Sequence, residues 1–505
     1  MSVRHVIALG WLAAAVAAAP LAAAQTAAPA RSPVFSGGAS EPAPPPPAPE
    51  LPELGEAASA ELSLALEARI ADEIARQIRR SADLIDDAEL SNYLERLGQR
   101  LVAASPAPQQ PFRFFLLKDD SINAAAFVGG VVIVHSGLIL AAQSESELAS
   151  VLAHEIAHVT QRHIARMIAN QSQMSVPLLA ALAVAILAAR SSPDLASAAI
   201  ATSQAAAVQT QLNFSRDAER EADRIGLQIL EKAGFDPRGM PVFFERMQRA
   251  SHLQETGAPV YLRSHPLTFE RIADVDNRVQ QLPYRQVRDP VEFHMAREKL
   301  RVLRGSPRDL LVDFDHRLEQ GKFIDEQATR YGRALTLMRL GKLAEAENEL
   351  STLRTRFPAE PMVETMAGRL LWAQGRRDEA LAHYRSAIDR FPAHRALAYE
   401  YAQALYDSGQ VQASLEAARR ASQAFPGDSR LQRLQAQAYA AQGKQLLSHQ
   451  AQGEAYFLEW DLRAAVQQLE LAAQAEGSFY EKSIVESRLR ALRRELVAME
   501  ATRPR

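Results

Sequence analysis

Cysteine is absent from all 505 residues of this chain. Its absence excludes disulfide bonds, and it also excludes a lipid anchor attached through a cysteine. Charge of one sign is not in large excess, because 57 lysines and arginines stand against 60 aspartates and glutamates, a formal net charge of −3. Such a balance gives no basis for a nucleic-acid partner or for strong attraction to anionic lipid. The length indicates more than one domain.

The start of the chain has the pattern of a cleavable export signal. A basic beginning precedes an apolar stretch over residues 6–18, and small residues lead to a cleavage site after Ala24. We therefore predict a signal peptide over residues 1–24 and a proline- and alanine-rich linker over residues 25–55. An exported chain without cysteine is consistent with the bacterial periplasm.

A second apolar stretch covers residues 176–189 and carries no charge. It is shorter than the ~20 residues that a membrane-spanning helix needs. We predict that it packs as a helix or hairpin within the fold. Peripheral contact with a membrane surface and coverage of an active-site cleft are the alternatives.

His154, Glu155 and His158 form an H-E-x-x-H pentapeptide in a segment predicted to be helical. Residues four apart lie on one face of a helix, so both imidazoles can bind one metal ion, while Glu155 can take the proton of a water molecule beside it. This pattern is typical of zinc peptidases. The alternative is a buried structural helix with two core histidines, which gives no reason for a glutamate between them.

A catalytic zinc site needs a third protein ligand. His163 lies too few residues on to complete the longer H-E-x-x-H-x-x-G-x-x-H pattern. A second amphipathic helix carries Glu219 and Asp223 on one face, four residues apart. Glu219 can therefore bind the metal while Asp223 accepts a hydrogen bond from a ligand histidine, predicted to be His154. Glu221 lies on a different face, and an ordinary solvated helix is the alternative for the whole segment.

The pentapeptide, followed at this distance by S-R-x-x-E-x-x-A-D, resembles the zinc peptidase family that contains HtpX and the CAAX prenyl peptidases. Residues 121–130 and 264–271 carry the resemblance further, and the C-terminal repeats resemble those of its BepA-like periplasmic branch. The resemblance implies one zinc ion per chain and Glu155 as the catalytic base. It assigns the zinc ligands as His154, His158 and Glu219.

The S-H-P…E-R segment lies near the metal in this family, and here it supplies His265 and Arg271. We expect His265 to approach the zinc or its water and to hold the site closed in a resting state. We expect Arg271 to stabilise the oxyanion that develops on the scissile carbonyl. The alternatives are that His265 only shapes a turn before Pro266 and that Arg271 makes a structural ion pair.

A β-branched run over residues 131–135 follows two glycines and is a strand candidate. If it is an exposed edge, an extended polypeptide could pair with its backbone, with little dependence on substrate sequence. A fully buried strand is the alternative. His135, at the end of this run, is predicted to be structural rather than a ligand.

Beyond about residue 325 the sequence becomes periodic. Phe-Pro pairs recur every 34 residues at Phe357, Phe391 and Phe425, and glycines recur at the same interval, at Gly341, Gly375, Gly409 and Gly443. A 34-residue period with these turn residues indicates tetratricopeptide repeats, which stack into a superhelix with a concave binding surface.

These observations predict a mainly α fold in which a peptidase domain precedes a solenoid. The zinc peptidase domain, helical with a small sheet, covers residues 56–300. A connector follows over residues 301–324, and the α-solenoid of tetratricopeptide repeats covers residues 325–505.

By resemblance, this architecture implies a periplasmic zinc endopeptidase of misfolded or stalled proteins, in quality control of outer-membrane β-barrel proteins. The repeats would recruit unfolded or misassembled clients or the outer-membrane assembly machinery. The alternative is a chaperone or assembly adaptor that acts through its repeats, with latent proteolysis. The intact pentapeptide together with Glu219 favours an active enzyme.

Overall fold

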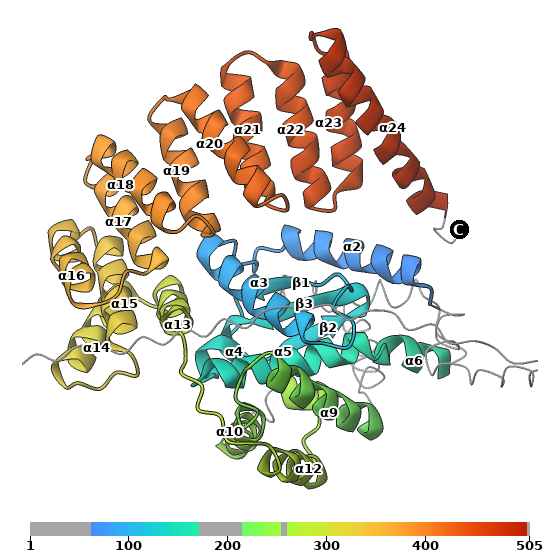
Figure 1. Cartoon of the computed structure of the whole chain (residues 1–505), viewed down its shortest axis with the longest axis vertical. Coiled ribbons are helices and arrows are strands. Elements are labelled where there is room, and N and C mark those ends of the chain that lie inside the picture. The colour runs from blue at the N-terminus through green and yellow to red at the C-terminus, as the bar shows by residue number, and fades with distance from the viewer. Residues whose placement is uncertain (1–61, 171–214, 254–259, 502–505) are drawn as a thin grey trace, which may run out of the picture. The chain divides into compact units, whose positions relative to one another are not determined.

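The computed structural model describes residues 62–170, 215–253 and 260–501 (Figure 1). The predicted signal peptide, the whole predicted linker and the apolar stretch over residues 176–189 lie outside the described residues. None of the helices in the described ranges combines the length and apolar character needed to cross a membrane.

The predicted mainly α fold is confirmed, with one small sheet near the N-terminal end of the described chain (Figure 1). The elements that surround the sheet and follow it are α2 (Leu64–Arg80), α3 (Ala88–Ala103), β1 (Arg113–Leu117), β2 (Ala124–Phe127), the 3₁₀ turn η1 (Val128–Gly130), β3 (Val131–His135), α4 (Ser136–Ala141), α5 (Glu145–Thr160), α6 (His163–Asn170), α9 (Arg216–Lys232), α10 (Gly239–Leu253), α11 (Val260–Ser264), α12 (Phe269–Gln280) and α13 (Val291–Arg304).

The sheet has the strand order β1-β3-β2, with β1 parallel and β2 antiparallel to β3. All five residues of β3 are buried. Of the two possibilities that the sequence left open for residues 131–135, the exposed edge is excluded and the buried strand is correct. The β-branched run is central because side chains on both of its faces pack against other elements, as in a strand with no solvated face. The outer strand next to the helix with the pentapeptide is β2.

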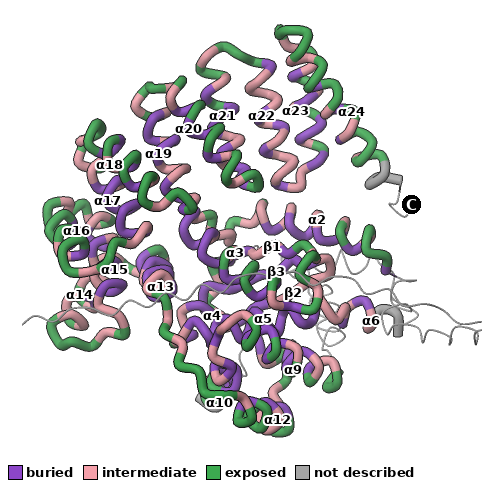
Figure 2. The backbone as a smooth tube through the Cα atoms, viewed as in Figure 1, coloured by how far each residue is buried: buried purple, intermediate pink, exposed green. Residues whose placement is uncertain are grey.

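Helix α5 is buried along nearly its whole length, as its purple tube in Figure 2 shows. Its start is capped by Ser144, whose hydroxyl accepts a hydrogen bond from the N–H of Glu147, and acidic residues occupy its first turn. Its apolar side chains, among them Leu148, Leu152 and Ile156, pack in the largest hydrophobic core together with side chains of α3, α9 and α10. A helix held on all sides presents its polar residues at fixed positions.

The remaining described helices are one single helix followed by five helix pairs, the later of which stand side by side in Figure 1. They are α14 (Pro307–Glu319), α15 (Glu326–Arg339), α16 (Leu343–Arg356), α17 (Pro361–Ala373), α18 (Arg377–Arg390), α19 (Arg395–Asp407), α20 (Val411–Ala424), α21 (Ser429–Ala441), α22 (Gln445–Leu458), α23 (Leu462–Gln474) and α24 (Phe479–Ala501).

The glycines of the 34-residue period lie between the two helices of successive pairs. All four have a positive φ, which is 73° at Gly341, 78° at Gly375, 81° at Gly409 and 75° at Gly443. Because residues with a side chain rarely adopt this conformation, glycine ends the first helix of each pair and allows the chain to turn back. The domain boundaries at residues 300 and 325 stay a prediction.

Candidate metal centre

Helix α5 places His154 and His158 on one face, one turn apart, and both side chains are buried. Their Nε2 atoms lie 3.0 Å from each other. Two imidazoles whose ring nitrogens converge in this way share either a proton or a metal ion, since two nitrogen lone pairs at this distance repel. The pairing predicted from the four-residue spacing is therefore present.

Helix α9 brings Glu219 to the same point. Its carboxylate oxygens lie 3.5 Å from His154 Nε2 and 3.4 Å from His158 Nε2, and its side chain is buried. Ser215 caps this helix by accepting a hydrogen bond from the N–H of Ala218, so that Glu219 falls in the first turn facing α5. The ordinary solvated helix is excluded for this face of α9.

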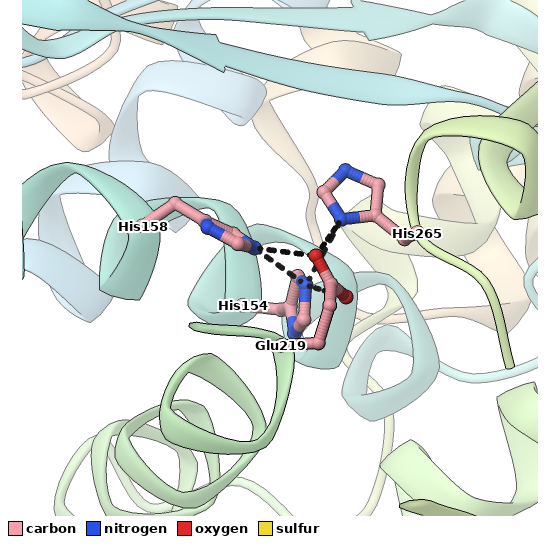
Figure 3. Close-up of side chains that lie close together, drawn as sticks. All are labelled: His154, His158, Glu219 and His265. Carbon is pink, nitrogen blue, oxygen red and sulfur yellow. Dashed lines mark hydrogen bonds and ion pairs between the residues drawn. The ribbon is translucent and has the colours of Figure 1, made fainter. Parts of the chain in front are cut away.

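His265 is the fourth member of the cluster and follows α11 (Figure 3). Its Nδ1 lies 2.9 Å from a Glu219 oxygen and 3.3 Å from His154 Nε2. The ring stacks on Tyr261, with centroids 4.8 Å apart. This histidine therefore contacts both Glu219 and His154, and its role in closing the site stays a prediction.

The cluster fits one tetrahedral ion. One potential ligand atom from each residue lies within 4.8 Å of the others, and all four residues are buried. The pairs given above are 2.9–3.5 Å apart. Ligands that surround a tetrahedral zinc ion at about 2.0–2.1 Å are about 3.3–3.4 Å from one another. The donor set of three imidazoles and a carboxylate is also one that zinc accepts.

Burial and neighbouring groups shift the pKa values of Glu219 and His158. Burial would raise the pKa of Glu219, but the charge of His265 and hydrogen bonds from three histidines outweigh it and hold this pKa well below its usual value. Burial also lowers the pKa of His158 well below its usual value, so its imidazole is neutral. A carboxylate and a neutral imidazole are the protonation states in which these groups bind a metal.

Asp223 lies one turn beyond Glu219 and supports His154, as predicted. Its Oδ1 is 2.9 Å from His154 Nδ1. Burial opposes protonation of His154, but the hydrogen bonds and charges of Asp223 and Glu219 outweigh it and raise the pKa of this histidine to about 9. A carboxylate at Nδ1 keeps a proton there and turns Nε2 toward the cluster.

Arg271, at the start of α12, is fully enclosed, and the structure shows what its guanidinium contacts. Nε and one terminal nitrogen donate to Asp223 at 2.7 and 2.8 Å. The other terminal nitrogen donates to the carbonyl of Pro266 at 2.9 Å and lies 2.7 Å from Glu219. These contacts support the structural ion pair that the sequence left as the alternative, and a role as oxyanion donor stays a prediction.

Glu155 lies beside the cluster with its carboxylate between β2 and His265. One oxygen accepts a hydrogen bond from the N–H of Ala126 at 2.9 Å, and the other is 3.4 Å from His265 Nε2. Burial raises the pKa of this glutamate. A carboxyl group whose pKa is raised accepts a proton more readily, which suits the task of a general base in peptide hydrolysis.

Two residues outside the predicted set also belong to the site. His163, at the start of α6, has its Nδ1 2.9 Å from Nδ1 of His158, and its Nε2 is 3.1 Å from Glu221. The sequence excluded His163 as a ligand and placed Glu221 on another face of its helix, and neither is in the four-residue cluster. The spacing of these residues in the sequence does not predict that they meet, because the path of the chain after α5 determines the direction of the His163 side chain.

Comparison with known proteins agrees with this geometry. Residues 88–279 match the model of peptidase family M48, and residues 371–438 match a tetratricopeptide repeat model. The beta-barrel assembly-enhancing protease of Escherichia coli K12 is 35% identical over 337 residues, which are 66% of this chain and 69% of that protein. The putative beta-barrel assembly-enhancing protease of Vibrio cholerae is 36% identical over 309 residues, 60% of this chain and 63% of its own.

More distant matches extend the comparison. The mitochondrial metalloendopeptidase OMA1 of Schizosaccharomyces pombe is 30% identical over 196 residues, which are 39% of this chain and 54% of that protein. The crystal structure of yeast Tom70 aligns with 87% of this chain and 81% of its own, at 13% identity and a TM-score of 0.30, a similarity that supports no functional assignment.

A buried His/His/Glu/His cluster next to an acidic side chain is the site of a metallopeptidase. The chain belongs to peptidase family M48 and is similar to the beta-barrel assembly-enhancing proteases. The family that the resemblance implied is therefore confirmed, together with the metallopeptidase class and the repeats.

Proposed function

We propose that this protein is a zinc-dependent endopeptidase of the periplasm that degrades misfolded or stalled proteins during assembly of outer-membrane β-barrels. The observation that carries the proposal is the cluster of His154, His158, Glu219 and His265 with Glu155 beside it. The identity with the beta-barrel assembly-enhancing protease of Escherichia coli supports the assembly context.

In this proposal one zinc ion per chain is held by His154, His158 and Glu219. When bound, the ion supplies Lewis-acid chemistry that polarises a peptide carbonyl. Glu155 takes a proton from the water that attacks the carbonyl and then delivers it to the leaving amine. Asp223 keeps the proton of His154 on Nδ1, and Arg271 holds Asp223 and Glu219 in place through its buried ion pairs.

The outer strand β2 is the part of the sheet that lies against the site. Its Ala126 N–H donates to Glu155, so the backbone of β2 and the catalytic carboxylate are in direct contact. An extended polypeptide that pairs with β2 would therefore bring a peptide bond to Glu155, with main-chain hydrogen bonds as the main source of affinity. Such binding tolerates many sequences, which suits an enzyme for unfolded clients.

The repeats supply the recruiting surface in this proposal. Tetratricopeptide repeats bind other proteins along stacked helices, and residues 371–438 match their model. Unfolded or misassembled clients, or the outer-membrane assembly machinery, are the proposed partners. A chaperone or adaptor role through the same repeats is compatible with the fold. Unlike the protease role, it requires no peptide hydrolysis by Glu155.

Cleavage assays on the purified full-length mature chain test the proposed function. We expect slow hydrolysis of casein and of an unfolded outer-membrane barrel protein, because both offer extended backbone. A zinc chelator should abolish the cleavage, and added zinc should restore it. A protein that holds one zinc per chain, yet cleaves neither substrate even without the His265 side chain, would instead support the adaptor role.

His265 is proposed to hold the site closed in the resting state. Its Nδ1 lies among the proposed ligand atoms, at the coordination position that a catalytic zinc site leaves open for water or substrate. His265→Ala should therefore raise basal casein hydrolysis several-fold, measured at saturating zinc. His316→Ala, a change at an exposed position of α14, is the control and should leave the rate unchanged. A His265→Ala rate equal to or below that of the unchanged protein would reject the closing role.

A further inference from the structure

Each histidine of the pentapeptide has a ring nitrogen that faces away from the metal-ligand atoms. For His154 that nitrogen meets Asp223 directly. For His158 it meets His163, since the two Nδ1 atoms lie 2.9 Å apart, while Nε2 faces Glu219 (Figure 3). We propose that His163 and Glu221 form a relay that positions His158 for metal binding, an inference that rests on the proposed zinc site.

One arrangement of protons satisfies the hydrogen bonds between these three side chains when a metal is bound. A metal-binding Nε2 of His158 carries no proton, so the proton of its neutral ring is on Nδ1 and is donated to Nδ1 of His163. His163 must then be neutral, with its own proton on Nε2, where it is donated to Glu221 at 3.1 Å. Glu221 closes the relay as an acceptor.

The same logic shows what a different state of His163 would do. If Nδ1 of His163 carried a proton, Nδ1 of His158 would have to accept it, and the proton of His158 would move to Nε2. That nitrogen is the one directed at Glu219 and at the other ligand atoms. His163 therefore selects the tautomer of His158 that can bind a metal.

The path of the chain after α5 brings His163 to this position. Arg162 has a φ of +53°, a conformation that residues with a side chain rarely adopt, and it precedes α6, whose first residue His163 contacts His158. The guanidinium of Arg162 is anchored in turn by Glu67 at 2.7 Å and by the carbonyl of Leu62 at 2.7 Å. Contacts that hold an unfavourable backbone conformation are found where a side chain must be aimed.

The acceptor at the end of the relay is also held in place. Arg166, one turn into α6, donates to the same Glu221 oxygen at 2.9 Å. Helix α9 thus serves both histidines of α5 as well as the metal. It provides the ligand Glu219, the carboxylate of Asp223 for His154, and the carboxylate of Glu221 for His158 through His163. A simple packing role for His163 would not require this ordered series of acceptors.

Zinc affinity, measured by competition with a zinc-binding dye, tests the relay without reliance on proteolysis. His163→Phe removes both hydrogen bonds and should weaken zinc binding about 10- to 100-fold, the usual effect of losing a partner of a ligand histidine. His163→Asn is the matched control, because its side-chain oxygen replaces Nδ1 as the acceptor, and it should restore most of the affinity. Glu221→Leu should weaken binding, and Glu221→Gln, which keeps an acceptor, should weaken it less.

The melting temperature of each zinc-free variant separates positioning from folding. A loss of zinc affinity with an unchanged melting temperature supports the relay. A His163→Phe protein that binds zinc as tightly as the unchanged chain would overturn it, and so would equal losses in the Phe and Asn variants. If the unchanged chain and His158→Ala bind zinc equally or not at all, the proposed function fails instead.

Nitrogen NMR of the zinc-loaded full-length chain, labelled with ¹⁵N-histidine, provides a readout that needs no variant. The relay predicts a neutral His163 with its proton on Nε2 and a His158 with its proton on Nδ1. A proton on Nδ1 of His163, in either a neutral or a doubly protonated ring, would refute the assignment even if every variant failed to fold.

Discussion

Glu155→Gln should abolish proteolysis while the protein keeps its zinc. Glutamine has nearly the same shape and can still interact with the N–H of Ala126 through its carbonyl, but it cannot take a proton from the attacking water. General acid–base catalysis contributes about 10²- to 10⁴-fold, so we expect casein cleavage to fall by at least this much. Rates and zinc content measured on the same preparation test the prediction.

The outcome in cells separates the two proposed roles. If cleavage and rescue of a deletion strain disappear together in Glu155→Gln, the protease role is the main one. Full rescue by a variant that binds zinc but does not cleave would show that repeat-mediated binding is the main activity. Loss of zinc from Glu155→Gln would contradict the assignment of this residue as a base rather than a ligand.

Glu219→Ala should remove zinc from the site. This carboxylate is the member of the cluster supplied by α9, and it lies 3.4–3.5 Å from the ligand nitrogens of His154 and His158. Loss of a supporting partner costs about 10- to 100-fold in affinity, so loss of a ligand should cost more than about 100-fold. His154→Ala and His158→Ala should have similar effects, measured as zinc per chain after dialysis.

Asp217→Ala is the matched control for Glu219→Ala. Asp217 is an acidic residue in the same first turn of α9, but its side chain is 92% exposed. It should leave zinc content and melting temperature unchanged. Stoichiometric zinc in Glu219→Ala would contradict the choice of third ligand and would leave His265 as the candidate for that position.

The metal centre was predictable from sequence where spacing on a helix decides the geometry. The four-residue steps from His154 to His158 and from Glu219 to Asp223 each place two side chains on one face, and burial of α5 and α9 then brings the two faces together. The contact between Asp223 and His154 follows from the same rule.

Other parts of the site depend on the path of the chain between helices, which spacing does not reveal. His163 contacts His158 across a turn in which Arg162 adopts a left-handed conformation. The sequence left Arg271 as either an oxyanion donor or a structural ion pair, and it did not reveal the three acceptors that surround its guanidinium. The number of such acceptors depends on how α9, α12 and the segment before α12 pack together.

The fold, like the site, has features that the sequence predicts and features that it does not. The 34-residue period was sufficient to predict the paired helices of the solenoid, because each repeat contacts its neighbours and needs little long-range information. The place of residues 131–135 in the sheet was not predictable from their composition. A β-branched run fits both an edge and a centre, and the pairing of β1 and β2 on either side of it decided the matter.

A crystal structure of the zinc-loaded chain, with anomalous diffraction measured on both sides of the zinc absorption edge, tests the central claim most directly. We expect one anomalous peak per chain, about 2.0–2.2 Å from His154 Nε2, His158 Nε2 and a Glu219 oxygen. No peak at this position, or a peak out of bonding distance of Glu219, would contradict the account.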